Sequence, residues 1–364
     1  MKIVAFGRTL LFSAALMVGL PLTARATLPP LPPGDPLAQD ISATALDPQS
    51  ATVISWLTGA GGFGTGKLRI DFSMEVNEAP AGTATLPVTQ RPGYFLPDCD
   101  TGLNIPIPAG GTLEGEMGYQ CISGGDCHLF VFDKSTNRLF ESFNTDITNN
   151  VLQSACAVVW QLNAVYGPFR RGLQCVSTDS AGLPVAPLLF DADEVASGRI
   201  AHAIRFLLPN ARIRANDFTL PATHGAGSTG PTTAPSWGAR FRLRPDFPMT
   251  SLPNDAARTV ATALQKYGMV LADGGNIALT ARSDRFTTAK WAALLQSTDL
   301  QAIQVSDFQM IQTGTHFAET GNCVRQPAPQ PPPSVPLPKG AALVLAAALA
   351  AVGAATLARR RARR

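Results

Sequence analysis

His128 is the histidine whose neighbours are best suited to acid–base chemistry. It stands in GGDCHLFVFD, where a glycine-containing loop enters a predicted strand, two residues after Asp126. The stretch HLFVFD-KSTN-RLFESF predicts a β-hairpin turning at 136–137, which brings Asp133 and Glu141 towards the same region. Because a histidine beside carboxylates can exchange protons with a substrate, we predict catalytic roles for His128, Asp133 and Glu141, and a binding role for Asp126. The alternative is a polar turn and a strand-edge histidine bonded to the backbone.

His202 and Asp273 complete the catalytic candidates. His202 lies in GRIAHAIRF, predicted as a strand with apolar neighbours on the same face, so a core histidine is the alternative. The preceding acidic run FDADEVASG offers oxygen ligands for calcium, although it reads equally well as the polar start of a short helix. Asp273 begins the turn of a predicted hairpin, MVLA-DGG-NIALTA. Convergence of His128, Glu141, His202 and Asp273 in one pocket would favour an enzyme.

His224 and Trp237 flank the long loop PATHGAGSTGPTTAPSWG, and we predict that both line a ligand groove. A flexible surface loop is the alternative. The chain lacks the G-x-S-x-G motif of one class of serine hydrolases and the E-x-D-x-E pair of one class of jelly-roll glucanases.

The six cysteines are Cys99, Cys121, Cys127, Cys156, Cys175 and Cys323. An even number in an exported chain favours disulfides, and a bridge between Cys156 and Cys175 is the first expectation. Zinc at Cys121-x5-Cys127-His128 is the competing hypothesis, but no second cysteine–histidine pair has ligand spacing. We predict no metal and no cofactor.

Both ends of the chain are typical of targeting segments. Residues 1–26 combine Lys2 and Arg8, an apolar run and the triplet Ala24-Arg25-Ala26, which predicts a cleaved signal peptide. At the other end, a proline-rich linker (326–338) precedes residues 340–358, an uncharged stretch long enough to span a membrane as a helix. A cluster of arginines, RRRARR, closes the chain.

This C-terminal order resembles the VPLP variant of the PEP-CTERM sorting signals. The resemblance rests on Val335, Pro336, Leu337 and Pro338, on the apolar stretch 341–357 and on the arginines of 359–364. It implies that an exosortase-type membrane peptidase recognises and cleaves the tail, in a Gram-negative bacterium that also produces exopolysaccharide.

The middle of the chain is similar to a group of uncharacterised secreted bacterial proteins. The similarity rests on GDCHLFVFDKSTNRLFESFNT, STDSAGLPVAPLLFDADEVASGRIAHAIRF, ATHGAG, WGARFRLRPDF and KYGMVLADGGN, which lie within about 125–276. It implies secretion and a common fold, and it assigns no catalytic residue.

The charge of the exported part argues against nucleic-acid binding. The chain has 29 basic and 26 acidic residues. Residues 1–26 hold three of the basic residues and 339–364 hold six, with no acid in either, so 20 basic and 26 acidic residues remain, a net charge of −6. The basic isoelectric point therefore comes from the targeting segments.

Alternating apolar residues, as in KLRIDFSMEVN, predict a mainly β domain: an antiparallel β-sandwich or jelly-roll-like ectodomain with two short helices, at 253–268 and 287–298. The expected divisions are a signal peptide (1–26), a flexible lead-in (27–50), the ectodomain (51–325), the linker (326–338) and the sorting segment (339–364). Two function classes follow: a cell-surface protein that binds or processes extracellular polysaccharide, or a non-catalytic matrix or adhesion protein displayed by its tail.

Overall fold

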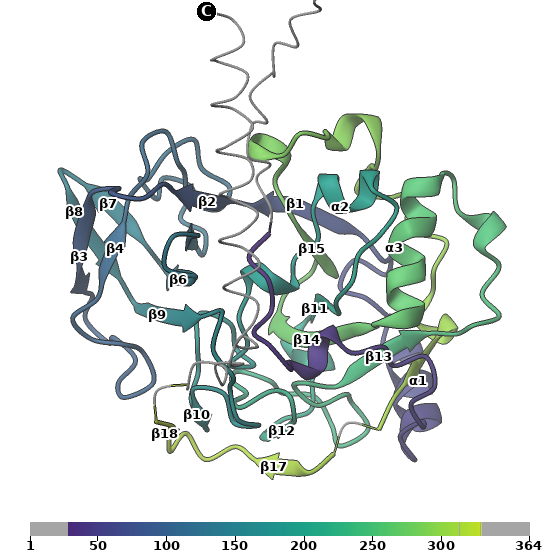
Figure 1. Ribbon diagram of the computed structural model, residues 1–364. Helices are drawn as coiled ribbons and strands as arrows, with labels where there is room; N and C mark the ends of the chain where they lie inside the picture. Colours follow the sequence, from purple (N-terminus) through teal and green to yellow (C-terminus); the bar gives the residue numbers. More distant parts are fainter. Residues whose placement is uncertain (1–27, 313, 328, 330–364) are drawn as a thin grey trace, which may run out of the picture.

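The computed structural model describes residues 28–312, 314–327 and 329. The predicted signal peptide, the VPLP motif and the predicted C-terminal helix lie outside these residues. No helix in the described ranges is long and apolar enough to span a membrane. The described chain is mainly β, with several sheets and three α-helices, and its elements form two halves that lie side by side (Figure 1).

The small half contains two four-stranded sheets, with strand orders β2-β5-β6-β9 and β4-β3-β8-β7. Their hydrophobic residues share one core, to which Leu129 and Val131 of β5 and Leu152 of β8 contribute. The alternate residues of β5, Phe130 and Phe132, enter a second core on the opposite face of their sheet. Both faces of this sheet are therefore buried. The strands are β2 (Val76–Ala79), β3 (Thr85–Gln90), β4 (Asn104–Pro106), β5 (Leu129–Asp133), β6 (Arg138–Phe143), β7 (Asp146–Thr148), β8 (Val151–Ser154) and β9 (Cys156–Gln161).

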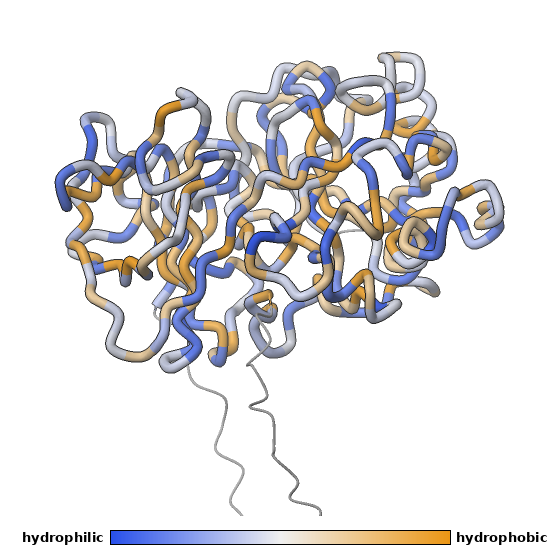
Figure 2. Tube along the Cα trace, turned by 90° about the horizontal axis from the view of Figure 1, so that it is seen from above, coloured by the Kyte–Doolittle hydropathy of each residue, from blue (hydrophilic) through white to orange (hydrophobic). Residues whose placement is uncertain are grey.

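The large half is built on a six-stranded sheet with the order β1-β15-β11-β14-β13-β16. Its core is the largest hydrophobic cluster of the described residues, and Figure 2 shows hydrophobic stretches throughout both halves. The strands are β1 (Ile70–Met74), β11 (Ile204–Leu208), β13 (Arg240–Leu243), β14 (Met269–Gly274), β15 (Leu279–Arg282) and β16 (Phe308–Met310). Two further two-stranded sheets pair β10 (Gly172–Leu173) with β18 (Val324–Arg325) and β12 (Asp217–Thr219) with β17 (His316–Ala318).

Three α-helices accompany the large sheet: α1 (Ser50–Gly59), α2 (Ala192–Ala196) and α3 (Asp255–Lys266). The helix α3 confirms the prediction for 253–268, because the Asn254 side chain caps the Ala257 N–H and Gly268 follows the helix at φ +71°. The helix predicted for 287–298 is wrong, since that stretch holds only one 3-10 turn, Trp291–Ala293.

The strand pairing differs from the antiparallel arrangement expected from the sequence. Four pairs are parallel: β1 with β15, β11 with β14, β2 with β5, and β3 with β8. The hairpin expected around Asp273 is also wrong, because β11 lies between β14 and β15 in the sheet. Alternation along the sequence identifies a strand but not its distant partner, and here the partners come from remote parts of the chain.

The strand expected for KLRIDFSMEVN divides at Glu75 into β1 and β2, which belong to different sheets. This stretch therefore connects the two halves (Figure 1). The segment expected as a flexible lead-in contributes Asp35 and Leu37 to the interior of the described chain.

The six cysteines form three disulfides, which confirms the expectation of disulfides. The predicted bridge from Cys156 to Cys175 is wrong, because each of these cysteines pairs with a different partner. The bridges are Cys99–Cys156, Cys121–Cys127 and Cys175–Cys323. Three disulfides are consistent with an oxidising extracellular or periplasmic location.

Candidate functional site

Residues 175–186, called here the crossing segment, run between the two halves. Ala181 and Leu183 pack in the large core, whereas Val185 and Ala186 pack in the core of the small half. The segment contains only one short 3-10 turn, beginning at Ala186, so its buried N–H and C=O groups cannot be satisfied by a helix or a sheet. Buried backbone groups need partners, and the neighbouring charged side chains supply several of them.

Glu141 anchors the crossing segment from the small half. Its fully buried carboxylate accepts hydrogen bonds from the backbone N–H groups of Val185 (2.8 Å) and Ala186 (2.9 Å). It also accepts from Trp160 Nε1 (2.9 Å) and Thr178 Oγ1 (3.3 Å). Burial raises the pKa of Glu141, although these donors oppose the effect. Glu141 therefore serves as a structural acceptor and does not face the solvent.

His128 holds the same segment from the start of β5. Its Nδ1 lies 2.6 Å from Glu114 Oε2 and its Nε2 lies 3.0 Å from Thr178 O. Both nitrogens face acceptors, so both carry protons and the ring is an imidazolium. Desolvation acts to lower the His128 pKa, but the Glu114 charge outweighs it and the pKa rises to about 9. His128 is thus a buried cation with no free nitrogen to act as a base.

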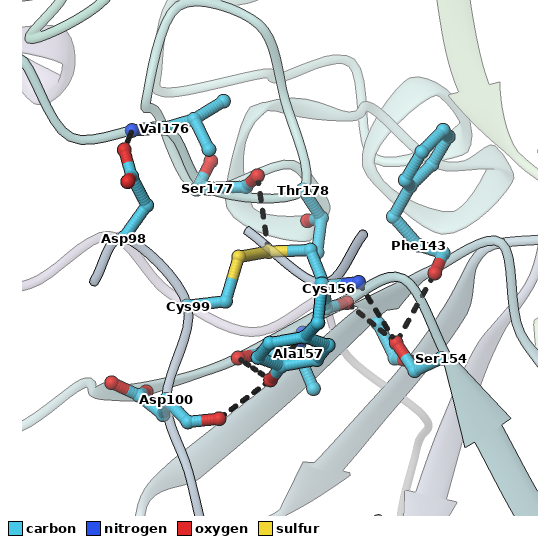
Figure 3. The surroundings of a disulfide bond; sticks show 12 residues. Asp98, Cys99, Asp100, Phe143, Ser154, Cys156, Ala157, Val176, Ser177 and Thr178 are labelled. Atoms are coloured by element: carbon cyan, nitrogen blue, oxygen red, sulfur yellow. Dashed lines mark hydrogen bonds between the residues drawn. A yellow bond between two sulfur atoms is a disulfide. The ribbon is translucent and has the colours of Figure 1, made fainter. Parts of the chain in front are cut away.

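The Cys99–Cys156 disulfide supports the beginning of the crossing segment (Figure 3). Asp98 Oδ2 accepts the Val176 N–H at 2.8 Å. Cys156 Sγ lies 3.5 Å from Ser177 O, a packing contact because a disulfide sulfur carries no hydrogen. The bridge and the carboxylate thus fix the chain just before Thr178.

Asp179 and Arg205 form the anchor on the large half. Both side chains are almost fully buried, and Asp179 Oδ2 accepts from Arg205 Nε (3.2 Å) and Nη2 (3.0 Å). Burial raises the pKa of Asp179 to about 7, against the lowering effect of Arg205. Desolvation alone would lower the pKa of Arg205, but Asp179 and Asp273 outweigh it, so the guanidinium stays charged.

Asp273, at the end of β14, is oriented by three donors. Its carboxylate accepts from Ser180 Oγ (2.7 Å), from the Gly274 N–H (2.8 Å) and, at 3.4 Å, from Arg205 Nη2. These contacts hold the carboxylate in one orientation while part of it remains open to solvent.

A hollow of about 560 Å³ opens beside Asp273 and Ser180. Asn210 and Asn276 bring exposed side-chain amides to it, and no hydrogen bond to another described residue occupies either amide. Gly274 lies close to the Asn210 amide, since a Cβ at 274 would stand 2.2 Å from Asn210 Oδ1. The remaining lining residues are Pro209, Ala226, Gly227, Gly274 and Gly275.

His224 adjoins the hollow from behind Ser180. Its Nδ1 lies 2.8 Å from Ser180 O, so this nitrogen donates, and the ring supports the Ser180 backbone. Trp237 is fully buried, with Nε1 donating to Ser228 Oγ at 3.2 Å. It packs so closely on the loop that a Cβ at Gly225 would lie 2.2 Å from its ring. Trp237 thus shapes the loop from within.

Asp126 is a further carboxyl group that interacts electrostatically with Asp273. Partial desolvation raises its pKa, the His128 charge opposes this, and the Glu114 and Asp273 charges add to it. Two cations, His128 and Arg205, interact electrostatically with four carboxyl groups: Glu114, Asp126, Asp179 and Asp273. Of these charged groups, Asp273 is the one that lines the hollow.

The structure thus brings together His128, Glu141, Asp273, Asp126 and His224 around the crossing segment, and it places Asp133 and His202 elsewhere. Asp133 lies at the far end of β5 from His128, roughly 15 Å along the strand, where its carboxylate accepts from Ser135 and Thr136. His202 precedes β11 and contacts Glu194 Oε1 (3.3 Å) and Ala203 O (2.8 Å).

The side chains that the sequence offers as ligands for calcium (in FDADEVASG) and for zinc (at Cys121 and Cys127) are bonded to other groups of the protein. Asp191 and Glu194 form a capping box at the start of α2, and Asp193 accepts the N–H groups of Thr288 and Ala289. The Cys121–Cys127 bridge uses both sulfurs of the zinc hypothesis.

Sequence reasoning missed Glu114, Asp179, Ser180, Arg205 and Asn210. One signal was available: an arginine within the apolar strand HAIRFLL must be paired when that strand is buried. The partner itself, in STDSAG, lies in a loop with no recognisable periodicity, so no sequence rule identifies it.

Comparison of the chain with protein-family models, with curated proteins and with solved structures gives no match.

The His128–Glu114 pair predicts a specific pH dependence of stability. The folded His128 pKa of about 9 exceeds the unfolded value of roughly 6.5, so the pair stabilises the fold fully below about pH 6.5. The contribution, about 3 kcal/mol at most, is lost as the pH rises from about 6.5 to 9. Urea unfolding across this range should show the decline.

The variant Glu114→Gln should flatten this decline, because the counter-charge that holds the proton is removed. Glu116→Gln is the matched control, since Glu116 bonds Ile122 N and Ser123 N and does not contact His128. Equal slopes for Glu114→Gln and the wild type would contradict the assignment.

Proposed function

We propose that this chain is an exported cell-surface protein that binds extracellular polysaccharide in the hollow beside Asp273. The observation that carries the proposal is the set of polar groups around that hollow: the Asp273 carboxylate and the Ser180 hydroxyl, which orient each other, and the unbonded amides of Asn210 and Asn276. Each sugar hydroxyl is both donor and acceptor, so adjacent hydroxyls match amides and carboxylates of fixed geometry.

Binding is favoured over processing by the state of His128. Both of its ring nitrogens are hydrogen-bonded inside the protein, to Glu114 and to Thr178. Glu141 is fully buried, and its carboxylate accepts four hydrogen bonds. Neither group can reach a ligand in the hollow, so the acid–base pair that the enzyme hypothesis needs does not face it.

The targeting segments support the surface location. We propose that residues 1–26 direct export and that the tail with Val335-Pro336-Leu337-Pro338 is cleaved by an exosortase-type peptidase. The three disulfides agree with an oxidising destination. Mass spectrometry of the mature protein should find a C-terminus near this motif. An intact end carrying Arg359–Arg364 would contradict processing and indicate a retained anchor.

A glycan panel tests the proposed function directly. The folded exported part should bind at least one bacterial exopolysaccharide, and Asn210→Ala should weaken that binding about fivefold, because each ligand hydrogen bond contributes on the order of 1 kcal/mol. Asn210→Ala is a clean change, since the amide makes no hydrogen bond to a described residue. Asp273→Asn should act in the same direction.

Asp246→Asn is the matched control, because Asp246 is well exposed and lies outside the hollow. Its binding should equal that of the wild type. Folded protein that binds no glycan would contradict the proposal and favour the alternative, a non-catalytic matrix or adhesion protein.

A further inference from the structure

A second pocket, of about 470 Å³, lies between the N-terminal segment 32–44 and the loops at 166–170 and 220–221. It shares no residue with the hollow beside Asp273. Its volume falls within the range of about 300–1,000 Å³ that is usual for small-molecule sites. Most of its wall is apolar, formed by Pro32, Pro36, Ile41, Tyr166, Pro168, Leu220, Pro221 and Ile311.

Three charged side chains lie in this wall, and each is at least nine-tenths buried: Asp35, Arg170 and Arg240. Arg170 pairs with Asp35, its Nη2 lying 3.1 Å from Asp35 Oδ1. The pair is neutral as a unit, and the Leu37 N–H also donates to the carboxylate at 2.9 Å. Arg240 therefore gives the pocket wall one net positive charge.

The guanidinium of Arg240 bonds only to neutral carbonyl groups. Its Nε donates to Tyr267 O (2.8 Å), its Nη1 to Pro36 O (2.9 Å) and its Nη2 to Gln39 O (3.2 Å) and to Tyr267 O. Four of five N–H donors are thereby used, and one on Nη1 is left. Desolvation lowers the pKa of Arg240 to about 10, so the group is still a cation at neutral pH.

An apolar pocket with one net positive charge in its wall selects a ligand of matching chemistry. A buried cation without a carboxylate partner is costly, and an anion beside it recovers part of that cost. The prolines and Leu220 favour an apolar body over a sugar ring, since they offer no hydrogen bonds. A simple inorganic anion would leave the apolar wall uncovered.

We propose that this pocket binds a small monocarboxylate with an apolar tail, of the fatty-acid type, with its head group at Arg240 and its tail among the prolines. The site is independent of the polysaccharide proposal, because it uses other residues and another chemistry.

Calorimetric titration of the folded protein with octanoate tests the proposal. Saturable one-to-one binding is expected, with octan-1-ol and octylamine at least about tenfold weaker because neither carries the charge that pairs with Arg240. No binding of octanoate would overturn the proposal. Equal binding of octan-1-ol would overturn the role of Arg240.

Two variants locate the site without disturbing Arg240 itself. Gln39→Glu places a negative charge at the exposed rim, beside the carbonyl that Arg240 contacts, and should weaken octanoate several-fold. Its matched control is Gln153→Glu, at an exposed position of β8 in the small half. If both variants bind octanoate alike, the pocket is not the site.

Gly167→Leu adds bulk at the pocket wall without a clash, since Gly167 lines the pocket and a Cβ there meets no atom within 4 Å. It should abolish octanoate binding, whereas Gly118→Leu, equally unhindered and outside the pocket, should leave it unchanged. Both glycine variants should retain any glycan binding at the Asp273 hollow. A failure of one proposal is thus distinguishable from a failure of the other.

Discussion

The arrangement of this protein depends on the burial of a non-repetitive segment between two hydrophobic cores. Residues 181–186 of the crossing segment are all buried, yet of these only Ala186 belongs to a helix or a strand. Each unpaired N–H or C=O group in such a place costs free energy comparable to a lost hydrogen bond. Nearby charged side chains supply hydrogen-bond partners for this backbone. Glu141 accepts hydrogen bonds from two backbone N–H groups, and the His128 imidazolium donates one to the Thr178 carbonyl.

The same requirement explains how Ser180 and Asp273 at the surface hollow are held in place. Asp179 holds the crossing segment to Arg205, and the next residue, Ser180, then meets Asp273. Ser180 and Asp273 at the opening are thus held by Asp179 and Arg205, which are themselves buried. A preoriented polar surface lowers the cost of ordering when a ligand binds, which suits recognition of a hydroxyl-rich polymer. It does not supply a mobile proton carrier, because the titratable groups behind it are committed to structural contacts.

The sequence predicts local features well and distant partners poorly. The hairpin of β5 and β6 is confirmed, because its turn at Asn137 and its alternating residues lie within one short stretch. The β14–β15 hairpin is wrong, because only the tertiary structure inserts β11 between these strands. In the same way, an even number of cysteines predicts disulfides, whereas the bridge from Cys175 to Cys323 joins residues 148 positions apart.

In the candidate site, too, the sequence predicts local features but not the distant contacts. The segments GDCH, STDSAG, ATHGAG and LADGG stand out in the sequence, and the structure brings all four to one place. Their roles could not be predicted, because whether a histidine is a base or a buried cation depends on what faces each nitrogen. Glu114, which decides this for His128, lies 14 residues away in an irregular loop.

Glu141 of the small half and Arg205 of the large half hold one crossing segment, Arg205 through Asp179 of that segment, so that each anchor depends on the other. A double-mutant cycle on the free energy of unfolding tests it with Glu141→Gln, Asp179→Asn and the combined variant. If the two anchors act on one segment, the combined loss should fall short of the sum of the single losses by about 1 kcal/mol or more. Asp246→Asn combined with Glu141→Gln should be additive and serves as the control. Additivity of Glu141→Gln with Asp179→Asn, within about 0.5 kcal/mol, would contradict the account.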